Sequence, residues 1–225
     1  MIDCVGPTLL VSPPSLPFAL VVHDWALVVD LQHVHTVLSS APYRGGLVQS
    51  RYIVNATVDP YYCPPHVSLA IAKQLDVLGL PIDSSTACVT AVEVKNYIRA
   101  EATECEFRCT AIVTAGIGNL SSPGLTPAAS YRSGTINIIA LIEASLAPAA
   151  LVEAVQIITE VKTRLLTGRL TSDGDPATGT STDTVTVALL PGPVSDYCGA
   201  VTMVGRALAR ACAEALSTAL LKTKA

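Results

Sequence analysis

The stretch "GTINIIALIEASLAPAALVEAVQIITEVKTRLL" (134–166) decides the fold class of this protein. Its first part, 134–146, is a strongly apolar run rich in isoleucine, which predicts a buried β-strand. Pro148 follows at a point where a helix can begin, because the missing N–H of proline costs nothing in the first helical turn. The apolar residues at helical spacing after it are Leu151, Val155, Ile158 and Leu165. We therefore predict a helix up to about Leu166, and a strand followed at once by a helix indicates an α/β protein.

Outside this stretch the sequence predicts further strands and two more long helices. The predicted strands are 25–31, 34–40, 51–58, 86–94, 104–116 and 184–190. The predicted helices are 66–80 and 200–221. No repeat of fixed period and no low-complexity linker divides the chain, so we predict a single domain over residues 1–225. Its fold class is α/β, with a mixed or largely antiparallel sheet covered by helices.

The composition argues against nucleic-acid and membrane partners. The formal net charge is −4 and there is no run of Lys or Arg, so a nucleic-acid partner is not expected. The first ten residues lack the basic region of a signal peptide. The longest apolar stretch, 18–31, is interrupted by His23, Asp24 and Asp30, so no membrane span is expected either. The resulting expectation is a soluble cytoplasmic protein.

The seven cysteines do not form a disulfide or metal pattern. Their number is odd and no CxxC pair occurs, which fits a reducing compartment. Cys105 and Cys109 would share a face of the predicted strand 104–116, so a metal role is conceivable. We favour buried cysteines that pack as small apolar residues.

Two histidines raise the same question. His33 and His35 are two residues apart on a predicted strand and would point to one face. That spacing can serve a metal ion, but no carboxylate or cysteine cluster nearby completes a ligand set. We favour partly buried histidines or histidines in a pocket wall.

Short polar side chains gather in three segments at predicted strand and loop junctions, 114–119, 133–137 and 177–183. Glycine lets a backbone approach a ligand closely, while Thr and Asn supply rigid hydrogen-bonding groups. We predict that the three segments converge at one edge of the sheet and line a pocket, although each alone could be a simple turn. The candidate substrate-binding residues are Asn55, Thr114, Gly116, Gly118, Asn119, Thr135, Asn137 and Thr178. None of the glycine patterns is a phosphate-binding fingerprint, and the motifs GxSxG and HExxH are missing from the sequence.

Lys162 lies on the apolar stripe of the predicted helix. Such a lysine usually extends its ammonium group to water. The alternative is that this helix face looks into the pocket, where Lys162 would pair with a carboxylate such as Asp183 or with the ligand.

Six motifs in a fixed order resemble the adenosylcobinamide amidohydrolase family. The resemblance covers about residues 30–220, and its specificity comes from the order of the motifs rather than from any one of them. The motifs are "VLSSAPYRGG", "YIVNATV", "TAGIGN", the 134–166 stretch, "ATGTSTDTVTVA" and "YCGAVTMVGRALARACAEAL".

The resemblance implies salvage of incomplete corrinoids for cobalamin synthesis. Such enzymes hydrolyse the amide that joins an aminopropanol arm to the corrin ring of adenosylcobinamide, giving adenosylcobyric acid and 1-amino-2-propanol. The corrinoid is then the substrate, and no cofactor or metal is expected. The long apolar helices would allow a homodimer.

For this chemistry we expect Asp183 to act as general base, on water or on the hydroxyl of Thr180 or Thr182. Backbone N–H groups between Gly116 and Asn119, or the Asn119 and Asn137 amides, would hold the oxyanion. Lys162 or Glu160 would give the leaving amine its proton.

Two other functions fit the same residues. One is a corrinoid-binding protein without catalysis on the same scaffold. The other is an amidase for another small metabolite, which would need only a small pocket where a corrinoid enzyme needs a wide cleft.

Overall fold

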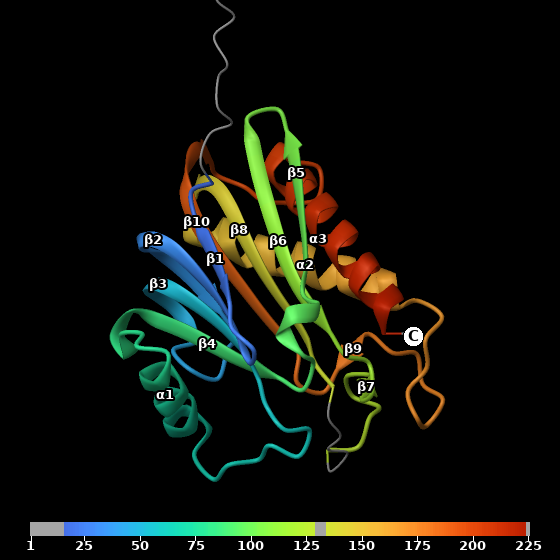
Figure 1. The fold of residues 1–225 in the computed structure, drawn as a ribbon. Coiled ribbons are helices and arrows are strands. Elements are labelled where there is room, and N and C mark those ends of the chain that lie inside the picture. The colour runs from blue at the N-terminus through green and yellow to red at the C-terminus, as the bar shows by residue number, and fades with distance from the viewer. Residues whose placement is uncertain (1–15, 129–133, 224–225) are drawn as a thin grey trace, which may run out of the picture.

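The computed structural model describes residues 16–128 and 134–223, which form one α/β domain (Figure 1). The first ten residues, Cys4 and Ser133 of the polar segment 133–137 lie outside these ranges. The strands are β1 (Ala19–Val22), β2 (Ala26–Ser39), β3 (Gly46–Thr57), β4 (Ser85–Thr90), β5 (Ile98–Glu104), β6 (Phe107–Ala115), β7 (Leu120–Ser121), β8 (Ile136–Leu146), β9 (Gly179–Thr180) and β10 (Thr184–Ser195). The helices are α1 (Val67–Val77), α2 (Pro148–Leu166) and α3 (Met203–Lys222), with short 3₁₀ turns η1 (Ile82–Ser84) and η2 (Val94–Asn96).

The eight-stranded main sheet is mixed and largely antiparallel, as predicted. Its strand order is β4-β3-β2-β10-β8-β6-β5, and β1 pairs with β2 outside this path. Two pairs are parallel, β3 with β4 and β8 with β10. Each is joined by a crossover that contains a helix, α1 in the first and α2 in the second, because parallel neighbours need a long connection.

The helices pack on one face of this sheet, and the opposite face is covered by apolar side chains of the strands themselves. Buried residues of α2 and α3 pack with those of β5, β6, β8 and β10 in the largest apolar cluster. Figure 1 shows α2 and α3 together behind these strands, and α1 apart from them beside β4. A second cluster joins Ile53 of β3 and Leu27 of β2 with Ile112 of β6 and Leu141 of β8. Strands from both halves of the sheet thus share one core, which holds the two halves in a fixed relation.

The sheet departs from the predicted strands at several places. The predicted strand 86–94 is wrong at its end, because β4 ends at Thr90 and Val94 lies in η2. The predicted strands 25–31 and 34–40 are the single strand β2, bent by a bulge at Gln32, which takes a left-handed backbone (φ 66°). Strands β1 and β5 were not predicted. The predicted strand 104–116 is wrong at its start, because a turn at Cys105 (φ 53°) separates β5 from β6.

This turn also corrects the prediction for Cys105 and Cys109. Cys105 is exposed in the turn, whereas Cys109 is buried in β6, so they do not share a strand face.

The predicted helix over 148–166 is confirmed at both ends, and no side chain caps the backbone at Ala147. Among the described residues, no helix combines the length and hydrophobicity that crossing a bilayer requires.

Candidate active site

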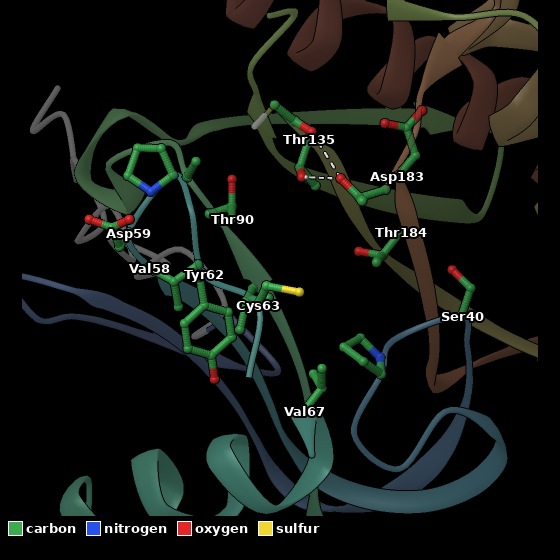
Figure 2. Close-up of a pocket in the computed structure, with 16 residues that line it drawn as sticks. Ser40, Val58, Asp59, Tyr62, Cys63, Val67, Thr90, Thr135, Asp183 and Thr184 are labelled. Carbon is green, nitrogen blue, oxygen red and sulfur yellow. Dashed lines mark hydrogen bonds between the residues drawn. The ribbon is translucent and has the colours of Figure 1, made fainter. Parts of the chain in front are cut away.

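Two hollows meet at one end of the sheet. The first has a volume of about 400 Å³ and the second, beside α2, about 410 Å³. The first is lined by Ser40, Pro42, Val58, Asp59, Pro60, Tyr62, Cys63, Val67, Val89, Thr90, Ala91, Gly134, Thr135, Thr182, Asp183 and Thr184. The second is lined by Leu38, Ser39, Ser40, Val152, Val155, Thr159, Lys162, Asp183 and Val185. In Figure 2 the side chains of Asp183, Thr184 and Ser40 form one wall of the first hollow and face Thr90, Tyr62 and Cys63. Ser40 and Asp183 border both hollows, so this is where the two connect.

Asp183 is held by four hydrogen bonds. One carboxylate oxygen, Oδ1, accepts from the Ile136 backbone N–H at 3.0 Å and from the Thr180 hydroxyl. The other, Oδ2, accepts from the Thr180 backbone N–H at 3.0 Å and from the ammonium group of Lys162. A carboxylate has about four lone-pair positions, so each of them is occupied and the orientation of the group is fixed.

Lys162 reaches this carboxylate from near the C-terminal end of α2, and its helix face borders the second hollow. The side chains of Lys162 and Asp183 are 12% and 9% exposed, so the ion pair is largely shielded from water. A shielded pair attracts more strongly than a surface pair, but each partner then depends on the other to offset its lost hydration.

Gly179 makes room for the pair. A Cβ atom at this position would lie 2.6 Å from Asp183 Oδ2 and 2.8 Å from Lys162 Nζ, closer than side-chain carbons approach other atoms. From the sequence, glycines in the polar segments were expected to let a ligand approach the backbone. Here the group that approaches the glycine is the ion pair itself.

Gly179→Ala should therefore displace the ion pair. Asp183 cannot move freely because of its four hydrogen bonds, so we expect the variant to lose about 1–3 kcal/mol of unfolding free energy. Turnover should fall by about 10²-fold, the usual effect of misplacing a reacting group by about 1 Å. Urea unfolding and steady-state kinetics measure the two effects. Gly199→Ala is the matched control, because a Cβ at Gly199 meets nothing within 4 Å.

Thr135 and Thr182 line the first hollow beside Asp183. Their hydroxyl oxygens are 2.6 Å apart, and the Thr182 hydroxyl also donates to the Gly134 carbonyl at 2.9 Å. The dashed lines of Figure 2 mark these contacts at the wall of the hollow. Since Thr182 donates to Gly134, Thr135 donates to Thr182. Both hydroxyl hydrogens are therefore used, and the two oxygens keep lone pairs that can accept hydrogen bonds from a ligand.

A buried polar network lies beneath the floor of the first hollow. Asn137 donates to Asn55 Oδ1 at 2.9 Å and to the Val89 carbonyl at 3.0 Å, and accepts from the Thr184 hydroxyl at 2.8 Å. Asn55 in turn donates to the Thr114 hydroxyl at 2.9 Å. The network joins β3, β6, β8 and β10, so it fixes the strands that carry the site.

The sequence of this chain matches the model of the adenosylcobinamide amidohydrolase family over residues 18–225. The chain belongs to this family. An adenosylcobinamide amidohydrolase of Halobacterium salinarum is 28% identical over 207 residues, which are 87% of this chain and 83% of that protein. The uncharacterized protein MJ1613 of Methanocaldococcus jannaschii is 27% identical over 221 residues, which are 87% and 86% of the two chains. A crystal structure of the PH0078 protein from Pyrococcus horikoshii OT3 covers 88% of this chain and 76% of that one, with a TM-score of 0.44 and 12% identity.

Four of the six motifs that resemble this amidohydrolase family supply residues to the two hollows. The motif over 37–46 supplies Ser40 and Pro42, and the motif over 177–188 supplies Thr182, Asp183 and Thr184. The three polar segments converge, as predicted, but segment 114–119 lines neither hollow. Asp183 accepts from the backbone N–H of Ile136, and Asn119 donates to Ser181 Oγ at 2.6 Å.

Several predicted site residues lie behind the walls of the hollows rather than in them. Asn55, Thr114 and Asn137 are buried in the network, where their polar atoms bind one another. Thr180 is buried behind Asp183, and its hydroxyl borders neither hollow. These residues position the site and are not placed to touch a substrate.

The loop glycines and their neighbours also stand away from the hollows. The Gly116 N–H donates to the Thr135 carbonyl at 2.9 Å, so it does not serve an oxyanion. A Cβ there would lie 2.7 Å from the Val92 side chain, which explains the glycine. Gly118, Asn119 and Thr178 line neither hollow.

Glu160, predicted as an alternative proton donor, lies on the exposed side of α2 and borders neither hollow. This leaves Lys162 as the predicted donor that reaches the site.

Neither histidine of the pair is a pocket-wall residue. His33 is exposed and His35 half-buried beside the β2 bulge, and burial together with the nearby His33 lowers the pKa of His35. Within residues 16–128 and 134–223, no group of three or more His, Cys, Asp and Glu side chains could hold a metal ion.

Two cysteines lie near the site but differ in character. Cys88 is buried below the floor and donates to Asn55 Oδ1 at 3.5 Å, and burial raises the pKa of its thiol to about 11. It is therefore a neutral donor in the network and not a nucleophile. Cys63 is exposed and lines the first hollow.

Ser40 borders both hollows and was not predicted as a site residue. Its backbone N–H donates to the Val185 carbonyl at 3.0 Å, and its Oγ accepts from the Val185 N–H at 3.0 Å. The serine lies in the motif over 37–46, but its place depends on the pairing of β2 with β10, which no local pattern indicates.

Proposed function

We propose that this protein hydrolyses the amide between the aminopropanol arm and the corrin ring of adenosylcobinamide. The products are adenosylcobyric acid and 1-amino-2-propanol, and the reaction serves corrinoid salvage. Membership of the amidohydrolase family and the named Halobacterium relative support this substrate. The observation that carries the proposal is the position of Asp183, oriented by Lys162, at the junction of two hollows.

The macrocycle binds at the mouth of the first hollow. The hollow of about 400 Å³ is not the wide cleft expected from the sequence, because a corrin with its amide arms is larger, so the ring stays outside and one arm enters. The rim offers apolar side chains, Pro42, Val58, Pro60 and Val67, which suit the face of the ring. The free lone pairs of Thr135 and Thr182 accept hydrogen bonds from the N–H groups of the amide arms.

Asp183 takes the proton of the attacking water. The Thr180 hydroxyl has a second acceptor, the Gly134 carbonyl at 3.4 Å, so its hydrogen bond to Asp183 Oδ1 can be given up when that oxygen takes a proton. Water then donates to this oxygen as it attacks the amide carbon, which makes Asp183 a general base. Its ion pair with Lys162 holds the carboxylate at the junction of the two hollows.

Lys162 gives a proton to the leaving nitrogen. The water oxygen forms a bond to the carbonyl carbon, the C–N bond breaks, and the nitrogen takes a proton from the Lys162 ammonium. Asp183 then loses its proton from Oδ1 to solvent and Lys162 takes one from solvent, which restores their ion pair through Oδ2. The cycle ends with acid and amine as products and with both side chains in their starting charge states.

Ser40 supplies a hydrogen bond to the oxyanion. Its Oγ already accepts from Val185, and the described part of the chain offers its hydroxyl hydrogen no acceptor, so this hydrogen is available at the junction. A fixed donor at this point stabilises charge that develops only in the transition state.

Ser40→Ala should lower kcat by about 10²-fold with a small change in KM, because the bond strengthens only as the oxyanion forms. Steady-state kinetics on adenosylcobinamide measures both constants. Ser172→Ala, at an exposed serine outside both hollows, is the control. A change in KM alone would place Ser40 in ground-state binding instead.

The proposed function is tested by incubating the purified protein with adenosylcobinamide. We expect one equivalent of 1-amino-2-propanol for each adenosylcobyric acid, followed by amine analysis and by mass spectrometry of the corrinoid. Corrinoid binding without release of amine would contradict the proposal and favour the binding protein. Hydrolysis of small amides alone would favour the other amidase.

A further inference from the structure

We propose that the hollow beside α2 is the subsite for the amine-side arm of the amide. The scissile bond would then lie across Asp183, with the macrocycle on one side and the arm on the other. This inference rests on the proposed function and assigns a place to the part of the substrate that leaves.

The placement follows from the residues that the hollows share. Only Ser40 and Asp183 among the described residues border both, so a bond at the junction has one hollow on each side. Lys162 borders only the second hollow. The leaving nitrogen needs a proton and the acid does not, so the nitrogen belongs on the side where the ammonium group lies.

The walls of the second hollow suit a short, branched amino alcohol. Leu38, Val152, Val155 and Val185 offer aliphatic surface to a methyl group. The Thr159 hydroxyl donates to the Val155 carbonyl at 2.8 Å, so its oxygen keeps lone pairs for the hydroxyl hydrogen of the arm.

Val152 is the position at which the subsite can be closed without disturbing the core. Its side chain lines the hollow and is 55% exposed, so a larger residue can extend over the opening. Gln156 lies one turn further along α2, is exposed and lines neither hollow. The same substitution there controls for a new aromatic side chain on the helix surface.

The first test compares two substrates, adenosylcobinamide and the analogue in which methylamine replaces aminopropanol. Val152→Phe should lower kcat/KM for adenosylcobinamide by about 10-fold or more, because the larger side chain reduces the space for the arm. It should change kcat/KM for the methylamide by less than about 3-fold. Gln156→Phe should leave both values near those of the wild type. Equal effects of Val152→Phe on both substrates, or none on either, would overturn the subsite.

The second test asks about Thr159, using the analogue in which isobutylamine replaces aminopropanol, so that a methyl group stands for the hydroxyl. The wild type should prefer the natural arm, and Thr159→Val should reduce this preference by about 10-fold. A misfolded variant would lose both activities together without changing their ratio. An unchanged ratio in an active variant would overturn the subsite alone, whereas a wild type that cleaves none of the three amides would contradict the proposed function as well.

Discussion

Asp183→Asn should lower the turnover of adenosylcobinamide by about 10³-fold, within the range for loss of a general base. An amide side chain has nearly the same shape, but its single oxygen can accept from only one of the Ile136 and Thr180 backbone N–H groups, and it cannot take a proton from water. It also leaves the Lys162 ammonium without its counter-charge in a shielded place. The measurement is kcat from release of 1-amino-2-propanol under saturating substrate.

Two measurements distinguish loss of the catalytic step from misfolding of the variant. The visible absorption of the corrinoid, followed through gel filtration, should show that the variant still binds the substrate. Asp173→Asn makes the same exchange at an exposed aspartate outside both hollows and should retain full turnover. Near-normal turnover of Asp183→Asn would remove Asp183 from the mechanism.

Asn137→Leu should lower the free energy of unfolding by about 3 kcal/mol. Asn137 is 1% exposed, and leucine has a similar size, so the variant changes hydrogen bonding more than packing. Asn55 Oδ1, the Val89 carbonyl and the Thr184 hydroxyl each lose a partner. A buried polar group without a partner costs about 1–3 kcal/mol, and the Thr184 hydroxyl can rotate to recover part of this.

Urea unfolding followed by circular dichroism measures the loss. Asn96→Leu is the matched control, because Asn96 is exposed in η2 and surface exchanges stay within about 0.5 kcal/mol. If Asn137→Leu were as stable as the wild type, the network would not hold the strands together.

The fold class could be predicted because the periodic pattern was long. The 134–166 stretch has an apolar run followed by a helical stripe, and the structure confirms both. β1 has only four residues and β5 alternates small and charged side chains, so neither gives a clear pattern. The bulge at Gln32 was not predicted because glutamine is not a residue type that indicates a left-handed backbone conformation.

The segments that form the site could be predicted from the sequence. Which of their residues line a hollow and which are buried behind it could not. The segments that carry Asn119, Thr135 and Asp183 do converge, because the end of β6 and the starts of β8 and β10 lie at one edge of the sheet. Residue type did not distinguish Thr182, which lines a hollow, from Thr180, which lies behind Asp183. Ser40 and the hollow beside α2 depend on long-range strand pairing, which no local pattern encodes.

The position of β2 between β3 and β10 has a consequence for the newly made chain. Ser39 of β2 bonds through its hydroxyl to Thr186 of β10 at 2.7 Å, and the two residues are 147 positions apart. During synthesis β2 therefore keeps an open edge until most of the chain has left the ribosome, and such edges invite pairing with other chains. Folding should be slow compared with that of helical proteins of this length, since the last strand to be made joins the two halves.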